Sequence, residues 1–449
     1  MTRRIGTAIV AALAFLAVVL VPGTAGARVS STSAPTPQLA TSGTDGSIEE
    51  VVQLTQCGET MYAVGSFTRV RNAGQTAVIT RNNAFAFSAV APYRVTDWNP
   101  NVNGRVETVA CGTDGSVFLG GNFTTAGGAA NRNLAKVNAT TGTSMAFSFH
   151  PTGRVQHVEV VRDAAGVLHL LVGGYFSDLL DSRHPVTGAD DGYGTPAISG
   201  TYQFDGVSPH SPRVHNMSVY PAPYQPGSTT VNPAVLMTGV FTSVGGQRHE
   251  QVFRLNLTAG SATVSAWTPT ELFAHCIGRQ PFYAQDAAWA PDMSRIYVVT
   301  TGFRLASEQA LPPAQRPQTR TGPCDATIAY PVTENSFNGH LWINYTGCDS
   351  LYSVAADAET VYSGGHQRWV SNGRGCDRLG PGAVAQPGLS EVDSTTGLYQ
   401  PGPNRGRGLG AKDLLRTSAG LWIASDNQAN TARCAGTANR MGICFLPNN

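Results

Sequence analysis

Acid–base chemistry in this sequence would fall to a few histidine and carboxylate side chains. His157 and Asp286 stand in register with Glu107 in a repeating pattern, and His366 stands where that pattern is broken. A neutral histidine, or a carboxyl group with a raised pKa, can act as a general acid or base. The structural alternative is a polar ring that hydrogen-bonds water in a channel. The positions in register are Glu49-Glu50, Glu107-Thr108, Gln156-His157, Gln285-Asp286, Tyr352-Ser353 and Lys412-Asp413.

A second group of side chains suits recognition of a sugar or an acidic polymer. Aromatic rings stack on pyranose faces, and guanidinium groups bind carboxylates in pairs. The alternative is that these are ordinary solvated residues of long loops. The group contains Asp178, Asp181, Arg183, His184, Asp190, Asp191, His275, Arg279, His366, Arg368, Trp369, Arg374, Arg405 and Arg407.

Motifs for metal and cofactor chemistry are weak. Asp190-Asp191-Gly192 is a fragment of a calcium loop without the other spaced oxygen ligands. The sequence has no Gly-x-Ser-x-Gly, no His-Glu-x-x-His and no glycine-rich phosphate loop before a helix. We therefore predict no metal and no cofactor.

These residues are organised by a short phrase that recurs seven times: an apolar run, one or two small residues and usually a phenylalanine. The phrase ends at positions 67, 123, 176, 241, 303, 367 and 427, so the period is 53 to 65 residues. Such periodicity is typical of a repeat architecture. The phrase is β-branched and aromatic and is bounded by turns, which predicts a strand, and its glycines indicate a closely passing backbone.

Each phrase lies within four candidate strands. In the second repeat these are Arg105 to Ala110, Ser116 to Phe123, Asn133 to Asn138 and Met145 to Phe149. Four short strands per repeat, without helices, describe a propeller blade. We predict an all-β, seven-bladed β-propeller with four-stranded antiparallel blades, a single domain spanning residues 38–449.

The two ends of the chain are expected to meet in the last blade. The last repeat supplies three strands, and residues 37 to 46 resemble the entry into a blade, so we expect this N-terminal segment to close the last blade. Residues 1–27, with Arg3 and Arg4, an apolar stretch and Ala25-Gly-Ala27, are predicted to be a signal peptide. Residues 28–37 are expected to be a flexible lead.

Eight cysteines in an exported chain predict disulfides, and the repeat register narrows the pairings. Cys276 and Cys324 stand in the same loop relation as Cys348 and Cys376 one repeat later. The predicted pairs are Cys276–Cys324, Cys348–Cys376, Cys434–Cys444 and Cys57–Cys111. We expect them to be structural bridges of an extracellular protein.

Charge and composition limit the partners. Charged residues make up 13% of the chain and the formal net charge is +1. Nothing in this balance favours nucleic acid or an anionic membrane. We expect a monomeric protein, secreted and extracellular, whose partner is a glycan or another protein.

Three connections between the second and third strands of a blade are expected to be long, at 177–197, 304–324 and 368–386. All three would lie on one face of the ring, where loops of a rigid scaffold usually bind ligands. In the last of them Gly365-His-Gln-Arg-Trp369 replaces the phenylalanine of the phrase, which predicts either a local hydrogen-bond network or a ligand contact.

The segments Trp98 to Ala110, Val117 to Gly128 and Asn133 to Gly142 together resemble the delta-60-repeat type of bacterial β-propeller. Phe241 to Gly246 and Ser390 to Gly397 repeat parts of the pattern. The resemblance implies the fold and export, and no particular activity.

Three functions remain open from the sequence. The first is a secreted, non-catalytic propeller that binds a glycan, a cell-wall component or a protein through its long-loop face. The second is a carbohydrate-active enzyme, a polysaccharide lyase or hydrolase, with its site at the axial mouth. The third, a quinone-cofactor dehydrogenase, would need a tryptophan-rich blade signature and a calcium site that the sequence does not show. The sequence favours the first, and so a protein that is not an enzyme.

Overall fold

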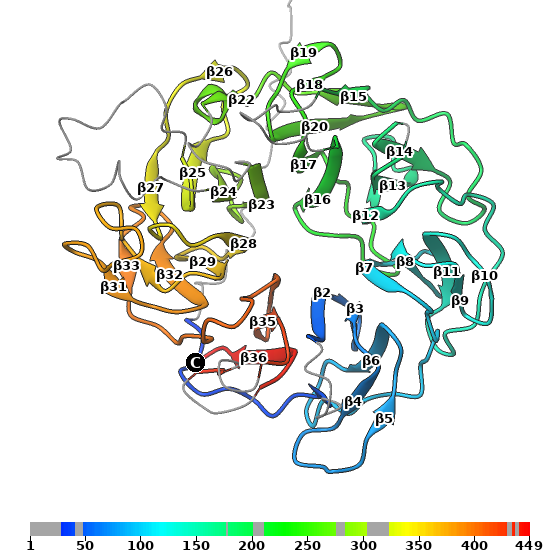
Figure 1. The fold of residues 1–449 in the computed structure, drawn as a ribbon. Coiled ribbons are helices and arrows are strands. Elements are labelled where there is room, and N and C mark those ends of the chain that lie inside the picture. Colours follow the sequence, from blue (N-terminus) through cyan, green and yellow to red (C-terminus); the bar gives the residue numbers. More distant parts are fainter. Residues whose placement is uncertain are drawn as a thin grey trace, which may run out of the picture.

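The structure is a computed structural model that describes residues 28–40, 48–176, 178–200, 211–274, 283–302, 323–428, 433–435 and 440–449. Within these ranges the regular elements are β-strands, apart from one 3₁₀ turn, η1 (Thr270–Phe273). Figure 1 shows the sheets side by side around a common axis, as in a β-propeller. The fold is all-β and propeller-like, as predicted. In the part of the chain that the structure describes, no helix is long and apolar enough to cross a membrane.

We number the main sheets one to seven in chain order, each starting from its innermost strand. The three-stranded ones are sheet one, β2 (Glu50–Cys57), β3 (Thr60–Ser66) and β6 (Ala84–Ser88); sheet two, β7 (Arg105–Cys111), β8 (Ser116–Asn122) and β11 (Leu134–Asn138); sheet three, β12 (Val155–Arg162), β13 (Leu168–Gly174) and β14 (Leu180–Arg183); and sheet seven, β34 (Asp413–Thr417), β35 (Gly420–Ala424) and β36 (Ile443–Pro447). The four-stranded ones are sheet four, β16 (Arg213–Tyr220), β17 (Ala234–Val240), β20 (Val252–Thr258) and β21 (Ser261–Val264); sheet five, β23 (Tyr283–Trp289), β24 (Arg295–Thr301), β25 (Ala326–Pro331) and β27 (Trp342–Tyr345); and sheet six, β28 (Leu351–Ala356), β29 (Thr360–Gly365), β32 (Leu389–Asp393) and β33 (Tyr399–Gln400).

Short accessory strands lie in the connections between the strands of these sheets and between the sheets. They are β1 (Gln38–Leu39), β4 (Arg69–Arg71), β5 (Ile79–Thr80), β9 (Thr125–Ala126), β10 (Ala129–Ala130), β15 (Ile198–Ser199), β18 (Ser243–Val244), β19 (Gln247–Arg248), β22 (Thr268–Pro269), β26 (Ser336–Phe337), β30 (Trp369–Val370) and β31 (Val384–Ala385). Four hairpins among them (β4–β5, β9–β10, β18–β19 and β30–β31) lie between the second and third strands of a main sheet.

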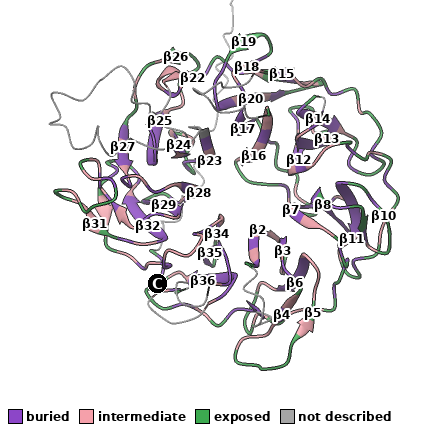
Figure 2. Ribbon diagram, in the orientation of Figure 1, coloured by how far each residue is buried: buried purple, intermediate pink, exposed green. Residues whose placement is uncertain are grey.

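The core lies between neighbouring sheets, because the second strand of each is apolar on both faces. Between sheets one and two, Tyr62 packs edge-on against Trp98, with ring centroids 5.0 Å apart, beside Val106 and Val109. Figure 2 shows the main strands largely buried and the connections exposed. Each fully buried side chain of this size contributes about 1.5–3 kcal/mol to folding, so the sheets stabilise one another.

A β-bulge recurs at the same point of the innermost strand in sheets one to six. One extra residue of this strand interrupts the pairing with its neighbour, as between Val106 and Thr108 or between Val155 and His157. A bulge re-aims side chains that would otherwise point to opposite faces. The extra residues are Val52, Glu107, Gln156, His215, Gln285 and Tyr352.

The prediction of four strands in every sheet is wrong for sheets one to three. In sheet two the expected fourth strand, from Met145 to Phe149, is reduced to a single bridge between Val137 and Ser144 and one hydrogen bond from Met145 N to Lys136 O. The chain then leaves the edge, because Ser148 N donates to the carbonyl oxygen of Thr187 in the next repeat.

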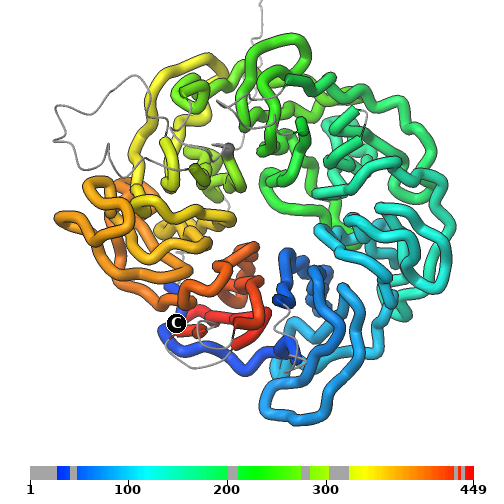
Figure 3. The backbone as a smooth tube through the Cα atoms, in the orientation of Figure 1, coloured from blue at the N-terminus to red at the C-terminus, as the bar shows by residue number. Residues whose placement is uncertain are grey.

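The N-terminal segment was expected to be flexible at residues 28–37 and to close the last blade with a strand at residues 37–46, and the structure differs from both expectations. Residues 28–37, expected to be flexible, run along β36: Ser30 N donates to Pro447 O over 2.7 Å and Ala34 N to Phe445 O over 2.9 Å. Leu39 N reaches Met441 O over 3.1 Å, yet β1 itself pairs with β4 of the first repeat. The contact with the last repeat therefore begins earlier than predicted (Figure 3); of the expected strand at 37–46, residues 41–46 lie outside the described residues.

The prediction of a long loop at 177–197 is also wrong. The third strand of sheet three, β14, begins only six residues after β13 ends, and Leu171 pairs with Ser182. The segment Leu180–Arg183 alternates buried and partly exposed side chains, which is the pattern of a strand that is covered on one face. Asp178 to Asp191 consequently belong to the sheet and its turn.

Three of the four predicted disulfides are present: Cys57–Cys111, Cys348–Cys376 and Cys434–Cys444. The first joins the ends of β2 and β7, as the repeat register required. Cys324 is buried and disulfide-bonded. Cys276 lies outside the described residues, so its pairing with Cys324 stays a prediction.

Candidate functional site

The innermost strands begin around a cavity of about 380 Å³ at one end of the axis, which we call the mouth. It is surrounded by residues of all seven main sheets, by Arg154 and Lys412, which directly precede β12 and β34, and by Tyr175, which follows β13. They are Val52, Gln53, Arg105, Glu107, Arg154, Gln156, His157, Tyr175, Arg213, His215, Asn216, Gln285, Tyr352, Lys412 and Asp413. Several are consecutive pairs, such as Gln156 with His157, which the β-bulges bring to the same side.

Three arginines occupy equivalent positions in successive repeats, and we call them the arginine crescent: Arg105 and Arg213 are the first residues of β7 and β16, and Arg154 directly precedes β12. The glycine of the recurring phrase fixes their backbone. A Cβ on Gly121 would lie 2.2 Å from the carbonyl oxygen of Arg105, and one on Gly174 would lie 2.3 Å from that of Arg154. The close backbone approach that the sequence predicted thus occurs at the residues that form the crescent.

Charges alternate along one side of the mouth. Glu50 lies 3.7 Å from Lys412 Nζ and 2.5 Å from Arg105 Nη1. Glu107 accepts from Arg105 Nε over 2.7 Å and also pairs with Arg154 Nη2. Each of these carboxylates therefore lies between two cations of adjacent strands.

The alternation stops after Arg154. The next position in register with Glu107 is Gln156, an uncharged amide, and beyond it Arg213 lies over the ring of Tyr175 at 5.2 Å. Burial lowers the pKa of Arg154, and the positive charges of Arg105 and Arg213 lower it further. Among the described residues, neither Arg154 Nε nor Gln156 Nε2 finds a hydrogen-bond partner. At this position of the register, the described part of the mouth has an amide in place of a carboxylate and two buried donors without a partner.

A second cavity, of about 740 Å³, continues along the axis. The two cavities share Gln53, His157, Asn216 and Asp413, which form a waist between them. On the far side, Gln225 reaches across from sheet four to sheet one, donating to Gln56 O over 2.7 Å and accepting from Gly58 N over 3.2 Å.

The waist is also a belt of hydrogen bonds between sheets. Gln53 Oε1 accepts from Val109 N over 2.6 Å, and Thr108 Oγ1 accepts from Val158 N over 3.1 Å. The same relation links Asp413 Oδ2 to Leu54 N over 2.8 Å. These polar side chains therefore hold neighbouring innermost strands together.

Asp286, a predicted acid–base candidate, belongs to this belt. Its Oδ2 accepts from Val354 N over 2.8 Å, and its Oδ1 accepts from Asn216 Nδ2 over 2.6 Å. Burial raises the pKa of Asp286 to about 8 and that of Asp413 to about 6. His157 Nε2 lies 3.2 Å from Glu159 Oε1. Of the predicted set, the mouth gathers His157 and Glu107, while Asp286 lines only the second cavity.

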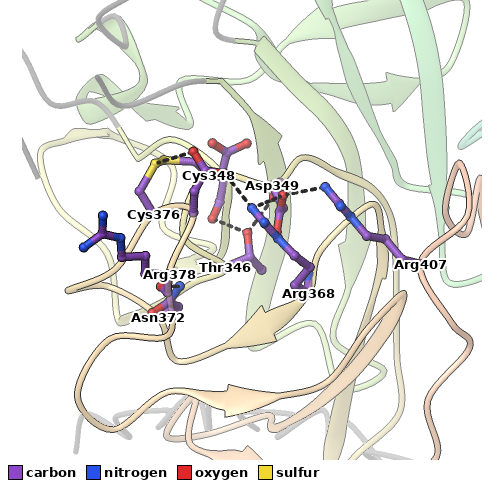
Figure 4. Close-up of a disulfide and its surroundings, with 10 residues drawn as sticks. Thr346, Cys348, Asp349, Arg368, Asn372, Cys376, Arg378 and Arg407 are labelled. Atoms are coloured by element: carbon purple, nitrogen blue, oxygen red, sulfur yellow. Dashed lines mark hydrogen bonds and ion pairs between the residues drawn. A yellow bond between two sulfur atoms is a disulfide. The ribbon is translucent and has the colours of Figure 1, made fainter. Parts of the chain in front are cut away.

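The other predicted cluster, in sheet six, is bound within the protein. Asp349 accepts from Arg368 Nε over 2.7 Å and from Arg407 Nη2 over 3.1 Å, and Arg368 Nη2 also donates to Asp377 over 2.7 Å. Figure 4 shows Asp349, Arg368 and Arg407 beside the Cys348–Cys376 bridge. The two cysteines directly precede Asp349 and Asp377 in sequence. We call Asp349, Arg368, Asp377, Arg407 and this bridge the clasp.

The residues next to the clasp in sequence also make their contacts within the protein. The guanidinium of Arg368 lies 4.2 Å from the centre of the Trp369 ring. Gln367, which replaces the phenylalanine of the phrase, is fully buried and donates to Ser363 O over 3.0 Å. Burial and the charge of Arg407 lower the pKa of His366, whose carbonyl oxygen accepts from Arg407 Nε.

The remaining predicted residues do not line the mouth. Arg183 pairs with Asp181 over 2.5 Å and lies over the Phe149 ring, on the outer part of sheet three. Asp178 and His184 flank the same strand. His275 and Arg279 lie outside the described residues. Nowhere in the described ranges do three or more His, Cys, Asp or Glu side chains gather to hold a metal.

The polar ring predicted from the repeat register includes Glu107, Gln156, His157, Gln285, Tyr352, Lys412 and Asp413 of the mouth, but the crescent was not predicted. A signal was present: Arg105-Val-Glu107, Arg154-Val-Gln156 and Arg213-Val-His215 repeat one tripeptide pattern at the start of three successive repeats. Arginine spaced in step with the repeat indicates a cluster at one end of the axis, because equivalent positions of a ring lie at one height.

No known protein family matches the sequence, and no curated protein does either. Solved structures with a similar arrangement include U3-55K, with a TM-score of 0.43, 11% identity and coverage of 90% of this chain and 97% of that chain. The WD40 β-propeller domain of Doa1 has a TM-score of 0.41 and 10% identity, over 91% of this chain and 96% of that chain. Similarity at this level says nothing about function.

Proposed function

We propose that this protein is a secreted, non-catalytic β-propeller that binds an extracellular ligand, a glycan, cell-wall component or protein, at the face that carries the mouth. The observation that carries the proposal is that cations outnumber carboxylates among the described residues there: Arg105, Arg154, Arg213 and Lys412 stand against Glu50, Glu107 and Asp413. A cavity lined by guanidinium groups in excess of carboxylates suits an anionic partner.

The proposal includes a ring of seven blades, closed between the first and last repeats, in a protein of the delta-60-repeat type. Contacts between innermost strands support closure, since each contacts the next and β34 contacts β2. Hydrogen bonds across that junction also support it, from Val51 N to Ser425 O over 2.9 Å and from Asn427 N to Glu49 O over 3.0 Å. Three disulfides support an extracellular location. We expect the protein to act as a monomer.

The enzyme alternative, a polysaccharide lyase or hydrolase, draws on the raised pKa of Asp286 and of Asp413. Their hydrogen bonds to backbone N–H groups of the neighbouring sheets favour a structural role instead. A carboxylate that holds an adjacent strand cannot leave that strand without loosening the belt.

Binding and turnover are tested together. The mature protein is applied to a glycan array, to purified cell walls and, as bait, to extracellular proteins, alongside the variant Arg105→Gln/Arg154→Gln/Arg213→Gln. We expect a ligand that the wild type retains and the triple variant loses. New reducing ends or unsaturated sugars released from a bound polysaccharide would establish the enzyme alternative. Equal binding by both proteins would place the ligand elsewhere.

A further inference from the structure

We propose that the ligand is a linear anionic glycan, and that one of its sugar units occupies a second space beside the mouth, where Arg132 contacts a charged group of the chain. This inference rests on the proposed function, because it extends the same site and names its ligand class. The chemistry recognised is an anion carried on a sugar ring, either a carboxylate or a sulfate.

This second space, which we call the outer cavity, has a volume of about 360 Å³ and lies between sheets two and three. It is lined by residues that directly precede β7, β11 and β12 and by residues at the end of β8. Arg154 lines both the mouth and the outer cavity, so the two spaces adjoin on one face. The polar lining includes Asn103, Asn122, Thr124, Arg132, Thr152 and Arg154.

Three side chains of the outer cavity are exposed and unoccupied by internal contacts. No hydrogen bond or ion pair joins the side chain of Asn122, Arg132 or Thr152 to another described residue. The wall beside them is fixed, because Asn103 Nδ2 donates to Thr124 Oγ1 over 2.7 Å and Asn103 Oδ1 accepts from Thr124 N over 2.9 Å. A ligand can therefore reach free donors and acceptors on a fixed wall.

The repeat shows that Arg132 is unusual in lacking a partner. Asn82, Arg132 and Glu250 occupy one position of the repeat, because the carbonyl oxygen of the next residue accepts in each case from the N–H of a glycine of the recurring phrase. Asn82 donates to Asn101 Oδ1 over 2.7 Å, and Glu250 forms an ion pair with Arg248 over 2.5 Å. In the second repeat the equivalent side chain is a cation that faces a cavity.

The charge of the outer cavity favours an anion. Its described lining contains Arg132 and Arg154 and no carboxylate. Arg154 is paired with Glu107 in the mouth, whereas Arg132 is left to the solvent. A guanidinium group binds a carboxylate or a sulfate through two parallel hydrogen bonds. Because cations also outnumber carboxylates in the mouth, a chain that carries several anions can occupy both spaces.

The other lining residues favour a sugar over a peptide as the carrier of the anion. Phe123 is the one apolar side chain in the described lining, and it is only 3% exposed. A peptide binds mainly through apolar and aromatic anchors in desolvated pockets, which the outer cavity does not offer. The amides and hydroxyl groups both donate and accept, as sugar hydroxyls do. The volume lies within the range of about 300–1,000 Å³ that ligand pockets show, which is enough for a sugar ring.

The test measures by calorimetry the binding of galacturonate and of its linear oligomers. Sulfated galactose oligomers, neutral galactose oligomers and an oligoglutamate peptide serve as comparison ligands. Arg132→Gln removes the charge, and Arg132→Lys retains it. Arg94→Gln is the matched control, because Arg94 is exposed and lines neither the mouth nor the outer cavity.

We expect the affinity of the wild type to rise from galacturonate to its oligomers, since only a chain reaches both cavities. Arg132→Gln should weaken oligomer binding about fivefold or more, because a charge-assisted hydrogen bond is lost at an exposed position. The gain in affinity with chain length should shrink in the same variant. Arg132→Lys should retain most of the binding and Arg94→Gln all of it, with no change in melting temperature. Sulfated oligomers that bind with the same dependence on Arg132 would identify sulfate as the anion.

Oligomer binding that is equal in Arg132→Gln and the wild type would overturn the inference. So would tighter binding of the neutral oligomers or of oligoglutamate. If anionic oligomers bind independently of Arg132 but are lost in the crescent triple variant, the proposed function stands and only the outer cavity is wrong. If the wild type binds none of these ligands, the inference fails, and the array and bait experiments decide the proposed function separately.

Discussion

The crescent and the clasp are two arginine clusters with opposite relations to their carboxylates. In the clasp, Arg368 and Arg407 share Asp349 and Asp377. In the mouth, Arg105, Arg154 and Lys412 share Glu50 and Glu107, and Arg213 lies over the Tyr175 ring. Arginine residues that are matched by internal carboxylates stabilise the fold, whereas arginine residues that line a cavity present their charge to a ligand.

The arginine pKa values of the two clusters shift in opposite directions, in agreement with this difference in pairing. Burial lowers the pKa of Arg368, but hydrogen bonds to Asp349 and Asp377 outweigh it, and the pKa lies above its ordinary value. Burial and two neighbouring guanidinium groups leave the pKa of Arg154 below its ordinary value. A candidate ligand site is therefore better indicated by unmatched charge than by the number of arginines.

The largest effect should follow from breaking the clasp. Asp349→Ala removes a buried carboxylate, with a side chain only 3% exposed, that binds both Arg368 and Arg407. Removing one partner of a buried ion pair costs about 3–5 kcal/mol. Urea unfolding should show a loss of this size, with ligand binding unchanged at temperatures where the protein is folded.

Asp377→Asn is the matched control, because the Asp377 side chain is 63% exposed. Its pair with Arg368 should contribute no more than about 1 kcal/mol. Equal losses in the two variants would contradict the assignment of Asp349 as the centre of the clasp.

A smaller loss should follow from opening the disulfide of the clasp. Replacing Cys348 and Cys376 by serine frees a loop with a sequence separation of 28 residues. The expected cost is about 2–4 kcal/mol, measured by thermal unfolding under oxidising conditions. If the serine variant kept the wild-type stability but lost binding of the ligand found in the array, the clasp would belong to the ligand site.

An effect of intermediate size is expected at the waist, where the free energy of unfolding should depend on pH through Asp413. The pKa of Asp413 in the folded protein is raised by burial to about 6, above its unfolded value. The folded state therefore binds the proton more tightly, and this contribution to stability is present below a pH of about 4 and is lost as the pH rises to about 6. Asp413→Asn should lack this loss, so its stability relative to wild type should increase across that window.

Urea unfolding of both proteins at several pH values measures this difference, and shared titrations cancel in the comparison. The asparagine oxygen can still accept from Leu54 N, which keeps the belt bond. A difference that stays constant from a pH of about 4 to about 7 would show that Asp413 has an ordinary pKa.

The smallest effect on stability is expected in the crescent. Arg154→Gln and Arg213→Gln each remove a partly exposed cation next to others of the same sign. Each should change the free energy of unfolding by no more than about 1 kcal/mol, while weakening the ligand found in the array. A loss as large as that of Asp349→Ala would show that the crescent is structural, and the comparison between the two clusters would fail.

Much of the architecture was predictable because it is local and repeated. The strands of sheet seven were expected at Lys412 to Arg416, Leu421 to Ser425 and Met441 to Leu446, and they begin and end within two residues of those limits. The Cys57–Cys111 and Cys348–Cys376 bridges followed from the repeat register, and Cys434–Cys444 followed from closeness in sequence. The errors fell at sheet edges, such as Met145 to Phe149, where a neighbouring repeat competes for the strand.

The sequence by itself determined the repeat, its strands and the positions of arginine within it, because strand pattern and spacing are properties of short segments. It did not determine which arginines meet a carboxylate. Arg368 was predicted to contact a ligand, but the fold brings Asp349 and Asp377 to it. Arg154 was not predicted as a site residue, and the fold pairs it with Glu107 of the preceding repeat. Charge pairing acts between repeats far apart in sequence, so only the tertiary structure decided which cations meet a carboxylate.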